Sequence, residues 1–188
     1  GVPRRGRGDG RRPPPPRPPA RGLAPMDPQV AELCRLVKQA PLNEVTKTIV
    51  GAEAQALRDA RGRSLLFYAA MRGGPAMVAK ATASATASST SFVREPPQVA
   101  AEVCRHLVET VGIDVNLVQP PQCLSQTALF YAARYGTPEV VAALLDLRAE
   151  IDRRDYHAQT PLFYAAVGGN TPTVQLLCER QADAAAQD

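Results

Sequence analysis

The chain is short of the residues on which catalysis and metal binding most often depend. Among its 188 residues there is no Trp, and there are only two His and four Cys. No CxxC pair, zinc-type spacing or Gly-rich phosphate loop occurs, and neither His has a Cys or Ser placed to form a catalytic dyad. These absences favour a protein that is not an enzyme and that holds no metal or cofactor.

Long apolar runs are also missing. No stretch approaches the roughly 18 residues needed to span a bilayer, and the N-terminus lacks the apolar core of a secretory signal. The four Cys are far apart, and three of them lie in apolar helical patterns, where a small buried thiol is expected. Because unpaired thiols persist in reducing compartments, we expect a cytoplasmic or nuclear protein that does not bind membranes.

The positive charge is concentrated at one end of the chain. Residues 1–25 carry seven Arg and one Asp, a net charge of +6, whereas the whole chain has +4. The remainder is therefore slightly acidic, with a net charge of −2.

Residues 1–26 form a leader rich in Arg, Pro and Gly, and Met26 is the first Met. This composition buries no core and predicts a disordered segment with polyproline II character. Three interpretations remain open: a translated GC-rich untranslated region, a generic disordered tail, or a specific ligand. As a ligand it would suit an SH3-type groove or contact phosphates.

One hexapeptide occurs three times in the remaining chain. The copies, each containing Leu-Phe-Tyr-Ala-Ala, lie at residues 65–70, 128–133 and 161–166. Each copy follows a Ser or Thr and precedes a Gly. The last two copies are 33 residues apart, and self-similarity at this period indicates stacked repeats.

The first two copies are 63 residues apart, so the first unit contains about 30 extra residues. Most of these lie at about 75–97, between the two predicted helices of one repeat, and a few lengthen the turn at 119–125. An insertion in a surface connection costs little, because loop-closure entropy grows only logarithmically with length. A retained intron would give the same pattern, and both interpretations stay open.

The sequence of residues 27–57 predicts a helical hairpin. Asp27 and Pro28 have the features of an N-cap and a first-turn proline, and apolar residues then recur every 3.6 positions, which predicts a helix over 28–39. A second short helix is expected to end at Gly51. Because this hairpin lies one repeat upstream of the first hexapeptide, we expect it to be a degenerate capping repeat.

The chain resembles the ankyrin repeat. The best match is Asp-Tyr-His-Ala-Gln-Thr-Pro-Leu-Phe-Tyr-Ala-Ala-Val-Gly-Gly at 155–169, and Gly-Ile-Asp-Val-Asn at 112–116 resembles the end of a repeat. The resemblance covers about residues 58–188. It implies an all-α solenoid of stacked helix-turn-helix units with short β-turn or hairpin loops.

The repeat pattern divides the chain into five parts: a leader (1–26), a capping repeat (27–57), and ankyrin repeats at 58–118, 119–155 and 156–188. The chain ends where a further turn should begin, so we expect the protein to continue into at least one more repeat.

Local conformations are predicted at several residues. A turn at 59–63 should place Gly62 at positive φ, and Ser64 and Thr160 should cap the helices that follow them. The Gly that ends a second helix in the family is replaced by Arg148 and Gln181. A left-handed conformation there costs about 1 kcal/mol.

The hexapeptide departs from the family at one position. The family His is replaced by Phe67, Phe130 and Phe163, so the hydrogen bonds that the imidazole makes to the turn are lost. Burial of the ring is expected to substitute for them. The Tyr that follows each Phe is expected to reach a backbone group of a neighbouring repeat.

The resemblance places partner-contact residues at the turn tips and on the exposed side of the first helices. Carried over position by position, they are Ala60, Arg61, Arg63, Met71 and Arg72; then Cys123, Leu124, Gln126, Arg134 and Tyr135; then Tyr156, His157, Gln159 and Val167. The arginines would make this concave face basic, which favours an acidic segment of a protein partner. The alternative is that they are solvated side chains on a surface that binds no partner.

The function expected from the resemblance is protein–protein interaction, as a monomeric scaffold or adaptor. One alternative is the targeting portion of a larger enzyme whose catalytic domain lies outside this chain. Another is nucleic-acid contact through the leader, which predicts an affinity that falls steeply with salt.

Overall fold

A computed structural model describes residues 27–51, 53–72 and 96–183, and within these ranges all regular secondary structure is helical. The leader and the inserted stretch up to residue 95 lie outside the described residues.

The helices are short, as expected for repeat units. They are α1 (Pro28–Gln39), α2 (Leu42–Thr48), α3 (Glu53–Ala56), α4 (Leu65–Ala70), α6 (Pro97–Arg105), η1 (His106–Thr110), η2 (Pro121–Cys123), α7 (Ala128–Tyr135), α8 (Pro138–Asp146), α9 (Pro161–Val167) and α10 (Thr171–Glu179).

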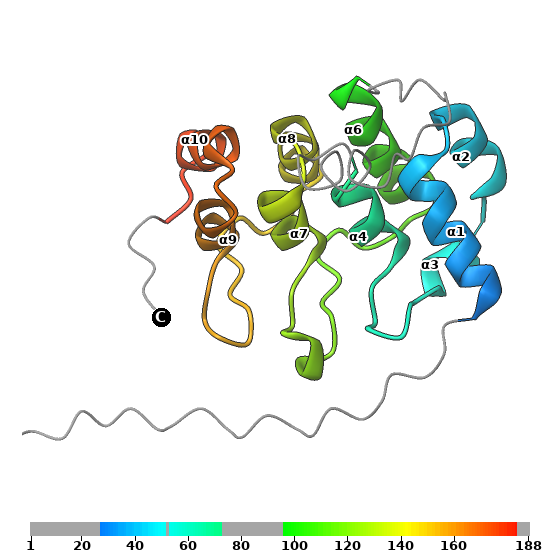
Figure 1. The fold of residues 1–188 in the computed structure, drawn as a ribbon, viewed down its shortest axis with the longest axis horizontal. Helices are drawn as coiled ribbons and strands as arrows, with labels where there is room; N and C mark the ends of the chain where they lie inside the picture. Colours follow the sequence, from blue (N-terminus) through cyan, green and yellow to red (C-terminus); the bar gives the residue numbers. More distant parts are fainter. Residues whose placement is uncertain (1–26, 52, 73–95, 184–188) are drawn as a thin grey trace, which may run out of the picture.

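The helices form two parallel rows (Figure 1). In the inner row α1 packs on α4, α4 on α7 and α7 on α9; in the outer row α2 contacts α6, α6 contacts α8 and α8 contacts α10. The turns that precede α4, α7 and α9 project from the inner row in the same direction. This arrangement is the predicted all-α solenoid, with α4 and α6 as the two helices on either side of the insertion.

Small residues let the inner helices approach closely. All six residues of α4 are buried, and the Ala-Ala pairs of α4 and α7 are fully inaccessible. A Cβ on Gly136 would lie 2.5 Å from the carbonyl oxygen of Ala70, a distance that real Cβ atoms do not tolerate. Gly136 is therefore required by the close approach of successive units.

Most of the predicted local conformations are confirmed. Asp27 caps α1 by accepting a hydrogen bond from the backbone of Gln29. Gly62, Arg148 and Gln181 have φ values of 72°, 69° and 64°, in the left-handed region.

The prediction that Ser64 caps α4 is wrong. Its hydroxyl is fully buried and has no hydrogen-bond partner in the described part of the chain, although its backbone occupies the N-cap position. Thr160 does accept from the backbone of Phe163, at 3.5 Å. The side-chain hydroxyl at this position therefore caps the helix weakly in the last unit and does not cap it in the first unit.

The cysteines are only partly as expected. Cys34 and Cys104 are buried, but Cys178 is exposed on α10, because it falls on the outward side of the helix. None of the described helices is long and apolar enough to cross a membrane.

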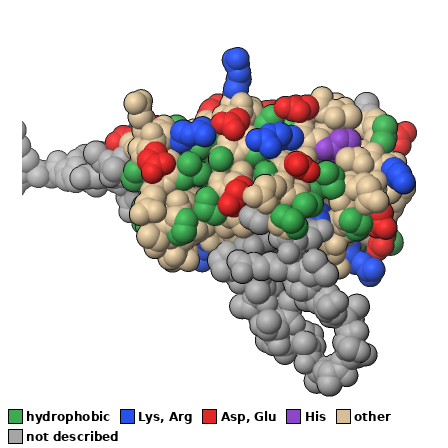
Figure 2. Space-filling view, turned by 90° about the horizontal axis from the view of Figure 1, so that it is seen from above, with side chains coloured by type: hydrophobic (Ala, Val, Ile, Leu, Met, Phe, Trp, Pro, Cys, Tyr) green, Lys and Arg blue, Asp and Glu red, His purple; other side chains and the backbone are tan. Residues whose placement is uncertain are grey.

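The outer row carries charges of both signs. Figure 2 looks onto this row and shows acidic, basic and apolar side chains intermixed. Asp146 on α8 pairs with Arg180 at 3.0 Å and with Arg105 at 3.9 Å, so ion pairs link α6, α8 and α10. This face therefore has no uniform sign of charge with which to attract a partner.

Candidate functional site

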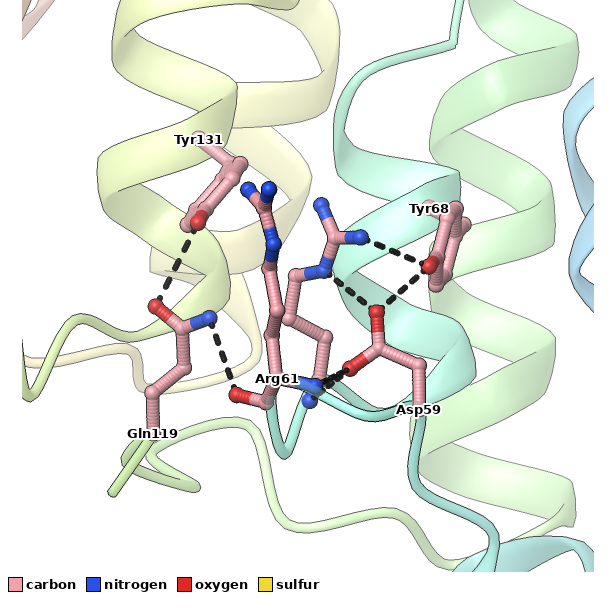
Figure 3. A network of polar contacts seen from close by, with 6 residues as sticks. Asp59, Arg61, Tyr68, Gln119 and Tyr131 are labelled. Carbon is pink, nitrogen blue, oxygen red and sulfur yellow. Dashed lines mark hydrogen bonds and ion pairs between the residues drawn. The ribbon is translucent and has the colours of Figure 1, made fainter. Parts of the chain in front are cut away.

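A hydrogen-bonded network stabilises the turn before α4 (Figure 3). Asp59 is buried, and its Oδ1 accepts hydrogen bonds from the backbone N–H groups of Arg61 and Arg63, both at 2.8 Å. Its Oδ2 accepts from the Tyr68 hydroxyl at 2.6 Å and from Nε of Arg63 at 2.7 Å. The carboxylate thus ties the turn to the helix that follows it.

The last unit repeats this network with a partner from the neighbouring unit. Oδ1 of Asp155 accepts from the backbone of His157 and Gln159, and Oδ2 accepts from the Tyr164 hydroxyl at 2.7 Å. Gln126, in the preceding turn, donates to the same Oδ2 at 3.1 Å. Asp155 thus binds the backbone of its own turn and links that turn to the preceding one.

The middle unit uses an amide instead of a carboxylate. Oε1 of the buried Gln119 accepts from the Tyr131 hydroxyl at 3.3 Å, and its Nε2 donates to the carbonyl of Arg61 at 3.5 Å. The three tyrosines therefore bind the first polar side chain of their own turn. The prediction that they reach a backbone group of a neighbouring repeat is wrong, because the polar side chain of their own turn accepts the hydrogen bond instead.

Burial and hydrogen bonding shift the pKa values of the groups in these networks. Burial by itself would raise the pKa of Asp59, but the hydrogen bonds from Tyr68 and Arg63 and the Arg63 charge hold that pKa below its usual value. Burial, followed by the hydrogen bond to the carboxylate, raises the pKa of the Tyr68 and Tyr164 hydroxyls. At neutral pH each tyrosine is therefore a hydrogen-bond donor, as the turn network requires.

Between α7 and α9 the inner face contains an open hollow of about 170 Å³, which we call the α7–α9 hollow. Its lining residues are Leu124, Gln126, Phe130, Tyr131, Arg134, Tyr135 and Tyr164. An apolar cavity of about this volume accommodates a ring the size of benzene. The hollow is thus large enough for one aromatic or large aliphatic side chain.

Arg134 lies at the rim of this hollow, between two aromatic rings. Its guanidinium carbon is 5.1 Å from the ring centroid of Tyr135 and 5.9 Å from that of Tyr164. These are cation–π distances, which hold the guanidinium over the rings. No described carboxylate forms an ion pair with it.

The structure therefore brings together four of the predicted contact residues, Leu124, Gln126, Arg134 and Tyr135, around one hollow. It also adds Phe130, Tyr131 and Tyr164, which the sequence reasoning assigned to the hexapeptide core alone. Their contribution could have been suspected, because the edge of a ring that packs between two units also borders the surface between them.

Other predicted residues lie at the turn tips. Arg61 and Ala60 are exposed, and Cys123 is half-buried in η2. His157 is exposed and its ring lies 5.4 Å from that of Tyr156, while Gln159 is half-buried beside Asp155. Val167, at the end of α9, is 58% exposed.

Arg72 differs from the expectation, because it is buried rather than exposed. Its guanidinium donates to the carbonyls of Val37 and Ala40, at the C-terminal end of α1. The last carbonyls of a helix have no partner within the helix, and a cation satisfies them well. Arg72 is thus a cap for the neighbouring unit.

Three predicted contact residues, one of them Gln126 at the hollow, are held by structural contacts. Gln126 is buried and bound to Asp155, and Arg63 is half-buried and paired with Asp59 at 2.7 Å. Met71 is half-buried and packs against the core. The family pattern predicts where these residues lie in the repeat, but it does not predict the direction in which each side chain points.

His106, one of the two His of the chain, has a structural contact. His106 is half-buried, and its Nε2 lies 3.2 Å from the carbonyl oxygen of Ile49. The described residues contain no group of three or more His, Cys, Asp or Glu that could hold a metal ion.

Two rows of short helices, stacked with a period of 33 residues, define a helical-repeat protein. Comparison with protein families identifies the kind of repeat: residues 97–188 match the family of ankyrin repeats, in three copies. Residues 97–188 are therefore ankyrin repeats. A comparison with curated proteins gave no match.

Proposed function

We propose that this chain is a protein–protein interaction module, acting as a scaffold or adaptor. Ankyrin repeats are in general protein-binding units, and the family match supports the proposal. The observation that carries it is the α7–α9 hollow, a partly apolar depression beside a cation on the inner row.

The binding surface that we propose comprises the turn tips and the exposed side of the inner row. Arg61 and Arg134 supply its positive charge, because Arg63 is paired with Asp59 and Arg72 is buried under α1. In Figure 3 the Arg61 side chain rises between Tyr131 and Tyr68. Two cations without a described acidic partner favour an acidic segment of the partner protein.

The proposal includes a monomeric state, a cytoplasmic or nuclear location, and no catalytic role for this chain. The location is supported by the four cysteines, all of which are free. We propose no nucleic-acid or membrane partner.

The test is selection of binders from a random-peptide library with the full chain as bait. We expect binding to fall at least fivefold in an Arg61→Glu, Tyr135→Ala double variant, because reversed charge and lost aromatic area both weaken the inner face. Arg180→Glu, on the outer row, is the matched control and should bind as the original chain does.

The readout is the dissociation constant of selected peptides, with circular dichroism to confirm unchanged helicity. Equal binding by the double variant would show that the inner row is not the binding surface and would overturn the proposal.

A further inference from the structure

The α7–α9 hollow brings together a depression lined by aromatic and polar side chains and a cation, Arg134, that has no described acidic partner. Resting on the proposed function, we infer that it is a specificity pocket for a short acidic motif. An aromatic or large aliphatic side chain of the partner enters the hollow, and an adjacent Asp or Glu carboxylate binds Arg134.

The walls of the hollow suit an apolar side chain. Phe130 is 1% exposed, and its ring meets that of Tyr164 edge-to-face, with centroids 5.6 Å apart. Tyr131 and Tyr135 have centroids 6.3 Å apart at the other side. Offset and edge-to-face aromatic surfaces add to the free energy of burying another ring.

The acidic group next to the hollow is already fully hydrogen-bonded. Asp155 lies behind Tyr164 and Gln126, and its two oxygens accept four hydrogen bonds from side chains and backbone. Its buried carboxylate is therefore satisfied and does not compete for Arg134.

Arg134 is the group left to recognise an anion. Two aromatic rings hold its guanidinium in place, so little side-chain entropy is lost when a carboxylate binds. A planar guanidinium binds a carboxylate through two parallel hydrogen bonds, which an amide of the same shape cannot match. The pocket should therefore distinguish Asp from Asn.

The experiment is an NMR titration of the full chain with matched peptides. The probes have the sequence Gly-Ser-Asp-Phe-Asp-Ser-Gly, the same peptide with Asn for both Asp, and the same peptide with Ala for Phe. We expect the acidic aromatic peptide to shift the amide signals of α7 and α9 and to bind about fivefold to tenfold more tightly than either other peptide.

Three variants test whether Arg134 is the residue that causes the preference for Asp over Asn. Arg134→Gln should abolish the preference for Asp over Asn, Arg134→Lys should retain part of it as a point charge, and Arg180→Gln on the outer row should leave it unchanged. A preference that survives in Arg134→Gln would overturn the inference.

The outcomes also separate the inference from the proposed function. If library-selected peptides shift the inner-row signals but the Asp and Asn probes bind equally, the acidic motif is wrong and protein binding by the inner row stands. If no peptide, selected or designed, shifts any inner-row signal, the proposed function fails and the inference fails with it.

Discussion

Tyr68, Tyr131 and Tyr164 occupy the same position in three units but donate to different acceptors. Tyr68 and Tyr164 bind carboxylates at 2.6 and 2.7 Å, whereas Tyr131 binds the amide of Gln119 at 3.3 Å. Hydrogen bonds to a charged group contribute more than neutral ones, and short ones more than long ones. The same residue type at the same repeat position therefore contributes differently to the stability of each unit.

This difference gives a prediction at the residue scale. Tyr68→Phe and Tyr164→Phe should each lower the free energy of unfolding by about 1.5–3 kcal/mol, because a buried carboxylate loses a donor. Tyr131→Phe should cost only about 0.5 kcal/mol, since its bond is long and neutral. Urea denaturation of the three variants measures this, and equal losses at all three positions would contradict it.

At the scale of elements, the inner helices are joined by side chains that cap the helix before them. Arg72 donates to the last carbonyls of α1, and Asn170 donates to the carbonyls of Ala133 and Gly136, at the end of α7. The ends of α1 and α7 thus depend on the next unit for hydrogen bonds. Capping and stacking are then one cooperative interaction.

Arg72→Met should therefore destabilise the array although it keeps most of the side-chain volume. We expect a loss of about 1.5–3 kcal/mol, because carbonyls at the end of α1 lose a charged donor. Arg105→Met is the matched control: Arg105 is exposed, lies 3.9 Å from Asp146, and should cost less than about 0.5 kcal/mol. Thermal denaturation followed by circular dichroism compares the two.

The sequence predicts helices well where it carries explicit start and end signals. Asp27 and Pro28 mark the start of α1, and Pro97 marks the start of α6. Gly112, with a φ of 81°, ends the helical stretch that continues from α6 through η1. The short α3 (Glu53–Ala56) was not predicted, because four residues show no periodicity. The site was predicted only in part, since an Arg at a surface position of a repeat can turn inward, as Arg72 does.

At the scale of the whole molecule, two of the three inner Phe rings are covered by the Tyr of the next unit. The rings of Phe67 and Tyr131 meet edge-to-face at 5.3 Å, and those of Phe130 and Tyr164 at 5.6 Å. Phe163 has no such cover among the described residues and is 38% exposed, whereas Phe130 is 1% exposed. Stability is therefore distributed unevenly along the array.

Phe130→Leu and Phe163→Leu test this with the same change at equivalent positions. Phe130→Leu should lower the free energy of unfolding by about 1–2 kcal/mol, through a buried void and a lost ring contact. Phe163→Leu should cost less than about 0.5 kcal/mol, because its ring is partly solvated already. Equal effects in urea denaturation would mean that Phe163 is as well covered as Phe130.

The repeated hexapeptide also bears on how the units find their order. If the α4 unit stacked directly on the α9 unit, nearly the same apolar side chains would meet, so the hexapeptides discriminate poorly between neighbours. The turns do discriminate: Gln126 donates to Asp155, while Arg63, which occupies the same position in the first turn, is already bound to Asp59. The hydrogen bond from Gln126 to Asp155 therefore favours stacking of the α7 unit on the α9 unit, whereas the apolar contacts of the hexapeptides favour any pair of units about equally.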